Sequence, residues 1–120
     1  MKKGWFCLVL WVSGVAAAGP YERCLETAGG ATQPVLACMA QALKREDVRL
    51  NAAYRRMMAA LPEPRRRALR EVQRAWIRYR DLKCRFLYHP TSGSGGLQDQ
   101  QQCLIDETRR RAGELEAGRP

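Results

Sequence analysis

The chain has 120 residues, of which 21 are Lys or Arg and 12 are Asp or Glu, so its formal net charge is +9. This length is enough for one small domain and excludes a multidomain architecture. The positive charge favours contact with anionic polymers or membrane surfaces. A well-solvated cationic surface is the alternative interpretation, so charge alone does not define a partner.

Residues 1–18 have the pattern of a secretory signal peptide. Two lysines precede an apolar run over residues 5–15, and three alanines at 16–18 provide a small-residue cleavage site. The run is short for a membrane span and no later segment is long enough, so we expect no transmembrane span in the mature form. Cleavage after Ala18 leaves 19 basic and 12 acidic side chains, a net charge of +7. We expect a periplasmic or secreted protein, with an uncleaved N-terminal anchor as the alternative.

The mature chain keeps four cysteines, Cys24, Cys38, Cys84 and Cys103. Four thiols in a small exported domain predict two disulfides, and three pairings are open from the sequence. We favour Cys24–Cys38 and Cys84–Cys103, because each pair closes a short loop between adjacent segments. A zinc site built from Cys84, His89 and Cys103 is the alternative. Because the chain has one histidine and the compartment is oxidising, we expect no metal and no cofactor.

The first mature segment, residues 19–34, has little periodicity and predicts an irregular arm, with Thr32 as the cap of the next helix. Residues 35–61 repeat apolar side chains at helical spacing. Those within about 40° of one line on a helix are Leu36, Met39, Leu43, Leu50, Tyr54, Met57 and Leu61. Asp47 lies near the same line, and the apolar pattern does not explain its position.

A second helix is expected over residues 64–88, after the Pro62-Glu63-Pro64 break. So short a connection predicts that the two helices are antiparallel neighbours. The apolar face of the second helix carries Trp76, and two polar side chains, Gln73 and Arg80, lie close to the same line.

His89-Pro90 ends the second helix, and the Gly- and Ser-rich residues 91–96 predict a flexible loop. A third helix follows over residues 97–116, where Arg111 shares one face with the leucines, and residues 117–120 are expected to fray. The predicted fold is therefore all-α: an antiparallel helical hairpin plus a third, disulfide-tethered helix within a domain over residues 35–116, preceded by the irregular arm.

Four polar side chains, Asp47, Gln73, Arg80 and Arg111, lean toward faces that bury leucine and tryptophan. A buried charge without a partner is costly, so mutual pairing is the economical solution. We hypothesise that Asp47 accepts hydrogen bonds from Arg80, Arg111 or both, with Gln73 bridging nearby. The alternative is that each side chain lies at the edge of its apolar stripe and extends into water.

Arg65, Arg66 and Arg67 occupy the first turn of the second helix, where the helix dipole disfavours cations. Together with Arg70 and Arg74 they form a candidate contact for an anionic partner, and solvated side chains are the alternative. No recognisable nucleophile or carboxylate pair is present, so we do not expect an enzyme. Export also argues against nucleic acid as the partner.

The residues resemble those of the LprI-type family of small exported bacterial proteins, named for a mycobacterial lipoprotein described as a lysozyme inhibitor. The motifs that carry the resemblance are Asp47-x-x-Leu50-Asn51-x-x-Tyr54, Gln73-x-x-Trp76-x-x-Tyr79-Arg80-Asp81-x-x-Cys84 and Cys103-x4-Thr108-x-x-Arg111-x3-Leu115. The similarity covers about residues 32 to 116. The lipid-attachment cysteine of a lipoprotein is absent from this sequence.

The resemblance implies an α-helical, disulfide-bonded envelope domain that inhibits a lysozyme-type muramidase by occupying its cleft. It marks as family positions Trp76, Tyr79, Arg80, Asp81, Cys84, Cys103, Thr108 and Arg111. The partner it implies is lysozyme or another muramidase. The alternative function is a cationic scaffold or binder of anionic envelope glycans or lipids, without inhibitory activity.

Overall fold

The computed structural model describes residues 16–120, so most of the segment predicted to be a signal peptide lies outside the described residues. The described part contains four helices and no strand, which confirms the predicted all-α fold. The helices are α1 (Pro20–Ala28), α2 (Thr32–Ala60), α3 (Glu63–Phe86) and α4 (Gly93–Glu116). None of these helices combines the length and the apolar composition needed to cross a membrane.

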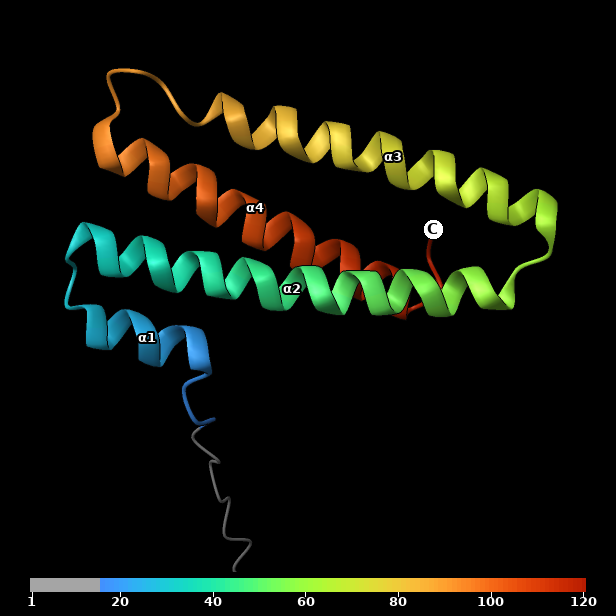
Figure 1. Ribbon diagram of the computed structural model, residues 1–120, viewed down its shortest axis with the longest axis horizontal. Coiled ribbons are helices and arrows are strands. Elements are labelled where there is room, and N and C mark those ends of the chain that lie inside the picture. Colours follow the sequence, from blue (N-terminus) through green and yellow to red (C-terminus); the bar gives the residue numbers. More distant parts are fainter. Residues whose placement is uncertain (1–15) are drawn as a thin grey trace, which may run out of the picture.

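Helices α2 and α3 form the expected antiparallel hairpin, but its two arms diverge from the turn at residues 61–62 (Figure 1). Helix α4 lies between the arms and packs most extensively on α2 and, over a smaller interface, on α3. Helix α1 folds back along the beginning of α2. The two arms are therefore held together mainly through α4 and only to a small extent by direct contact.

The segment expected to be an irregular arm is helical over Pro20–Ala28. Pro20 occupies the first turn, where its missing N–H costs nothing, and Glu22 complements the positive end of the helix dipole. Gly29 and Gly30 then adopt positive φ angles of 59° and 82°, which lets the chain reverse into α2. Thr32 is the first residue of α2 and Ala31 is the N-cap, with no side chain accepting a capping hydrogen bond, so the cap predicted at Thr32 is absent.

Helix α4 begins at Gly93, four residues earlier than expected, because the glycine-rich stretch continues the helix instead of forming a loop. Gly96 is buried in this first turn. A Cβ atom at Gly96 would collide with the side chain of Ser92, so the tight packing here requires glycine. The glycine-rich composition indicated a flexible linker. In the structure, glycine is required at position 96 because the helix packs tightly there.

The core consists of two apolar clusters along α2. One contains Leu50, Ala53, Leu69, Ala112 and Leu115, where α2, α3 and α4 converge near the hairpin turn. The other contains Met39, Ala42 and Ile105, with Tyr21 of α1 packed against it. Ile105 is fully buried although it lies off the face predicted for the last helix. Because α4 lies between two helices, it buries two stripes, and the sequence pattern revealed only one.

Both predicted disulfides are present. Cys24–Cys38 joins α1 to α2, and Cys84–Cys103 joins the end of α3 to α4, with Cα–Cα distances of 5.7 and 5.4 Å. The first bridge holds a helix that contributes no buried residue of its own. The second lies in the interior, with Cys84 fully buried, and fixes α3 and α4 at the end of the molecule farthest from the hairpin turn.

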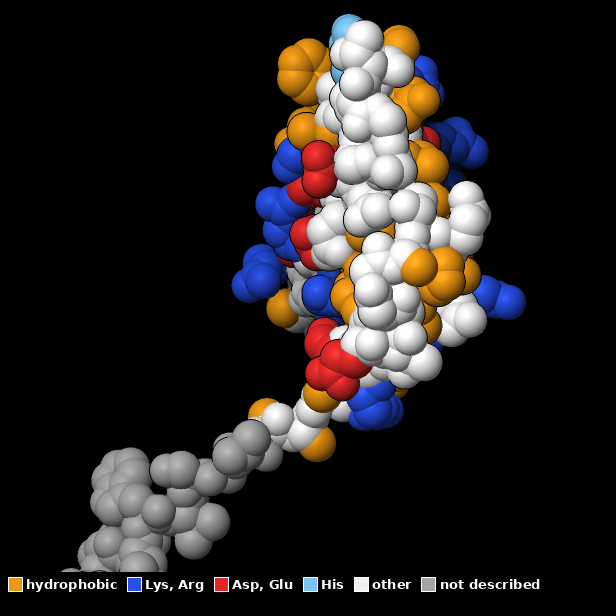
Figure 2. All heavy atoms as spheres, turned by 90° about the vertical axis from the view of Figure 1, so that its left-hand side faces the viewer, with side chains coloured by type: hydrophobic (Ala, Val, Ile, Leu, Met, Phe, Trp, Pro, Cys, Tyr) orange, Lys and Arg blue, Asp and Glu red, His pale blue; other side chains and the backbone are white. Residues whose placement is uncertain are grey.

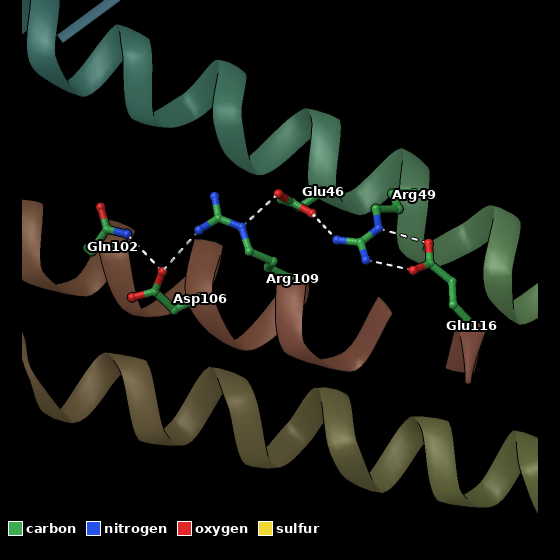
Figure 3. Close-up of polar contacts among 6 residues, drawn as sticks. All are labelled: Glu46, Arg49, Gln102, Asp106, Arg109 and Glu116. Atoms are coloured by element: carbon green, nitrogen blue, oxygen red, sulfur yellow. Dashed lines mark hydrogen bonds and ion pairs between the residues drawn. The ribbon is translucent and has the colours of Figure 1, made fainter. Parts of the chain in front are cut away.

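A row of ion pairs lies along one flank of the α2–α4 interface (Figure 3). The Arg49 guanidinium donates two hydrogen bonds to the Glu116 carboxylate, at 2.8 and 2.6 Å. Arg109 Nε donates to Glu46 at 2.9 Å, and Glu46 also accepts from Arg49. The hydrogen bond from Arg49 lowers the pKa of Glu116 below its ordinary value. These pairs fix the register of α4 along α2.

Replacing Cys84 and Cys103 together by alanine should lower the free energy of unfolding by about 3 kcal/mol, because the unfolded chain loses the constraint of a loop of 19 residues. Urea unfolding of the oxidised protein measures the difference. The matched control replaces Cys24 and Cys38, which should release α1 and leave the α2–α4 core intact. Equal stability of the Cys84/Cys103 variant and the wild type would contradict the structural role of this bridge.

Glu116→Gln should lower Tm at neutral pH and have no effect in acid. The pKa of Glu116 is lower in the folded protein than its ordinary value of 4.5, so its contribution to stability is complete above that value. The contribution disappears as the pH falls through the lowered pKa, because the folded protein must then protonate a paired carboxylate. Thermal unfolding of both proteins between neutral and acidic pH tests this. A Tm difference that does not depend on pH would contradict it.

Candidate functional site

An open groove of about 500 Å³ lies between α2 and α3. Each helix contributes residues at positions i, i+3, i+4 and i+7, which form one stripe on a helix. The lining residues are Asp47, Leu50, Asn51 and Tyr54 from α2, and Arg70, Gln73, Arg74, Trp76, Ile77 and Arg80 from α3. The volume falls in the range of pockets that accept a small molecule or a few side chains of a partner.

The groove exists because the two arms of the hairpin diverge while α4 closes the space behind them. Residues of the two motifs quoted for α2 and α3 therefore line a single surface: Asp47, Leu50, Asn51, Tyr54, Gln73, Trp76 and Arg80. Tyr79 and Asp81 do not line it. The sequence singled these motifs out as separate runs, and the structure brings most of their residues together.

Trp76 forms a partly buried platform in the groove. Its indole packs against the cluster that contains Leu50 and Leu69. The guanidinium carbons of Arg80 and Arg111 lie 5.1 and 5.9 Å from the indole ring centroid, within the range of cation–π attraction. The ring is therefore held by the core on one part of its surface and by two arginines on another, with the remainder open to the groove.

A polar seam joins α3 to α4 behind this platform. Arg111, which is buried, donates from Nε to Gln73 Oε1 at 3.0 Å and from Nη1 to Glu114 at 3.0 Å. Its Nη2 is buried without a hydrogen-bond partner among residues 16–120. Arg80 Nη1 donates to the fully buried Thr108 hydroxyl at 3.3 Å. The motif residues of α3 and α4 are thus joined directly.

Asp47 is not the centre of this network, contrary to the sequence-based hypothesis. It lies 3.8 Å from Arg80 Nη1, an ion-pair distance too long for a hydrogen bond, and it does not pair with Arg111. Arg80 instead donates from Nε and Nη2 to Asp81 at 3.0 and 2.9 Å. The divergence of α2 from α3 moves Asp47 to the rim of the groove, where 46% of its side chain is exposed.

The environment of Asp47 raises the pKa of its carboxyl group above the ordinary value. Desolvation by the groove walls is the largest cause, the nearby charge of Asp81 adds to it, and Arg80 opposes it. Among the described residues Asp47 is the only acid that lines the groove, which also contains Arg70, Arg74 and Arg80. The groove is therefore cationic overall, with an aromatic base.

Helix α3 carries nearly all the net charge of residues 19–120. It contains nine Lys and Arg residues and three Asp and Glu residues, a net charge of +6 out of the +7 counted for residues 19–120. Of the arginines proposed as a partner contact, Arg66 and Arg70 each donate a hydrogen bond to Glu63 at 3.0 Å. The hydrogen bond from Arg70 lowers the pKa of Glu63. Within the described chain Arg65, Arg67 and Arg74 form no ion pair.

Sequence reasoning missed an ion pair between α3 and α4. The Glu107 carboxylate is buried, and it accepts a hydrogen bond from Lys83 Nζ at 2.6 Å and another from Arg110. The hydrogen bond to Glu107 raises the pKa of Lys83. The sequence feature that could have revealed Glu107 is its spacing: it lies four residues after Cys103 and four before Arg111, on the inward face of α4. This pair strengthens the α3–α4 seam and lines no part of the groove.

The fold and the seam define a class: a small helical protein with two disulfides, whose groove is built by two motif-bearing helices. The family model described as "Lysozyme inhibitor LprI" matches residues 24–115. The chain therefore belongs to the LprI family, and the resemblance inferred from its motifs is confirmed. No curated protein and no solved structure matches the chain.

Gln73→Ala should lower the free energy of unfolding by about 2 kcal/mol, because the buried Nε of Arg111 would lose its acceptor. Urea unfolding measures the change. Gln100→Ala on α4, where the side chain forms no hydrogen bond with the described residues, is the control and should be nearly neutral. If the two substitutions had equal effects, the seam would not depend on this hydrogen bond.

Proposed function

We propose that this protein is a periplasmic or secreted inhibitor of a lysozyme-type muramidase, and that it acts sterically by docking its α2–α3 groove against the enzyme. Membership of the lysozyme inhibitor family is the observation that carries the proposal. The groove supports it, because Tyr54, Trp76 and three arginines line it. Tyrosine, tryptophan and arginine are the residue types that contribute most of the binding energy in protein interfaces.

Electrostatics define how such a complex would form. Common lysozymes are cationic, so a partner with a net charge of +7 is repelled at long range and associates slowly. At short range the situation reverses, because glycoside hydrolases carry a pair of carboxyl groups in their cleft. Arg70 and Arg74 on the α3 side of the groove suit a carboxylate at the edge of that cleft. Affinity then depends on local contacts rather than on net charge.

The proposed mechanism requires neither a cofactor nor turnover. A cleft that must admit a polysaccharide is blocked when a rigid body covers it. The Cys84–Cys103 bridge and the α3–α4 seam hold the α3 wall of the groove rigid, which reduces the entropy lost on docking.

Arg74→Glu should weaken inhibition of the target muramidase by about ten-fold, because it places an acid where the proposed contact needs a cation. Arg74 is exposed and has no ion-pair partner among the described residues, so the fold should tolerate the change. The control is Arg45→Glu, which alters the charge equally on a face of α2 away from the groove. Lysis of peptidoglycan, followed as a function of inhibitor concentration, gives the inhibition constants.

Full muramidase activity in the presence of stoichiometric oxidised protein would reject the proposal. Equal weakening by Arg74→Glu and Arg45→Glu would reject the groove as the docking surface. Salt-sensitive binding to an anionic envelope glycan without inhibition would support the cationic binder instead. Hydrolysis of a peptidoglycan fragment by the protein itself would show that it is an enzyme.

A further inference from the structure

We propose that the outward face of α3, opposite the face that packs on α4, rests on a bilayer surface that contains anionic phospholipid. This surface shares Arg74 with the edge of the groove and otherwise lies outside it, and it goes beyond the proposed inhibition. It consists of two parallel lines of residues on one helix. One line is apolar and the other is made of arginine.

The apolar line contains Val72, Tyr79, Leu82 and Phe86, which are 43%, 55%, 58% and 87% exposed. On a helix these positions lie within about 80° of one another. Leu87 and Tyr88, both exposed, follow directly after the end of α3. Four of the eight large hydrophobic side chains exposed within residues 16–120 therefore belong to this one line, and two more lie just beyond the end of the helix.

The arginine line contains Arg67, Arg74, Arg78 and Arg85, which fall within about 40° of one another on the helix. All four are exposed, and none forms an ion pair or a side-chain hydrogen bond with residues 16–120. The three acids of α3 lie at the edges of this line; Glu63 and Asp81 pair with arginines outside it, and Glu71 forms no ion pair with the described residues. The paired side chains of α3, such as Arg80 and Lys83, lie off the arginine line, so these four cations have their charges available for a partner.

The face opposite α4 falls between these two lines, so both can meet the same flat surface. An isolated apolar line would suit many partners, and an arginine line alone would suit any polyanion. Their adjacency over a helix of 24 residues, about 36 Å long, suits a surface that offers phosphates beside a shallow apolar layer. An anionic glycan has no apolar layer to receive Phe86. Headgroup phosphates attract the arginines, and the boundary of the acyl chains receives the aromatic and aliphatic side chains.

The end of the molecule at the α3–α4 connection shows this mixture, with hydrophobic side chains exposed beside Lys and Arg (Figure 2). Phe86, the most exposed large hydrophobic side chain among the described residues, is the last residue of α3 at this end. The groove opens between α2 and α3, so a protein lying on its outward α3 face keeps most of the groove free. Membrane contact and inhibition are therefore separable.

Co-sedimentation with lipid vesicles tests the proposal, using oxidised protein purified after export, its N-terminus determined by mass. Vesicles of equal parts phosphatidylcholine and phosphatidylglycerol should bind the protein at low salt and release it at high salt. Pure phosphatidylcholine vesicles should not bind it. Phe86→Ser should reduce binding about ten-fold. Arg78→Gln and Arg85→Gln should each reduce it about five-fold. Glu71→Gln should increase it.

Matched controls are Val48→Ser, which removes an exposed apolar side chain from α2, and Arg45→Gln, which removes an exposed cation from α2. Both should bind vesicles like the wild type, and Phe86→Ser and Arg78→Gln should retain muramidase inhibition. No binding to the anionic vesicles would overturn the proposal. Equal losses of vesicle binding in the α2 controls would also overturn it. A wild-type dimer in solution that Phe86→Ser converts to a monomer would overturn it as well, because a second copy would then cover the face.

Discussion

The structure depends on one constraint: α4 has to pack against both α2 and α3, which make few contacts with each other. Its contacts with α2 are apolar, through Ile105 and Ala112, and ionic along the flank that contains Arg49 and Glu116. Its contacts with α3 are largely polar and covalent, through the Cys84–Cys103 bridge and the Arg111–Gln73 hydrogen bond. The arms of the hairpin diverge because α4 lies between them, and the groove is the space that this divergence leaves in front of α4.

The polar character of the α3–α4 contacts explains why buried charge is tolerated on α4. Charges inside a small domain are costly unless each finds a partner of good geometry. Arg111 and Glu107 both lie on the inward side of α4, and their partners come from α3 or from the adjacent turn of α4. Such hydrogen bonds have directional requirements that apolar packing does not have. The polar seam therefore fixes the rotation and register of α3, and with them the position of Trp76 in the groove.

The three long helices, both disulfide pairings and the family follow from the sequence, because apolar periodicity, short loops between cysteines and a dense motif are local signals. The short helix α1 does not, because residues 19–34 show little periodicity. The details that failed depend on tertiary geometry. The inward position of Ile105 and Glu107 requires the knowledge that α4 is sandwiched, which one amphipathic stripe does not convey. Asp47 was expected to accept hydrogen bonds from Arg80, Arg111 or both, but because the arms diverge it forms only an ion pair with Arg80, at 3.8 Å. The exposed line ending at Phe86 can be recognised only when the side of α3 that faces α4 is known. The role of the groove residues stays a prediction.

The position of the Cys84–Cys103 bridge has a consequence for where the protein can work. The bridge joins α3 to α4 far from the hairpin turn. Between the bridge and the turn, the two helices are held only by side-chain contacts. Thiols stay reduced in a bacterial cytoplasm and oxidise beyond the inner membrane. Under the proposed export, a precursor awaiting translocation would lack this disulfide, and its α3 wall would not be fixed. The proposed binding surface would then form only on the side of the membrane where peptidoglycan is found.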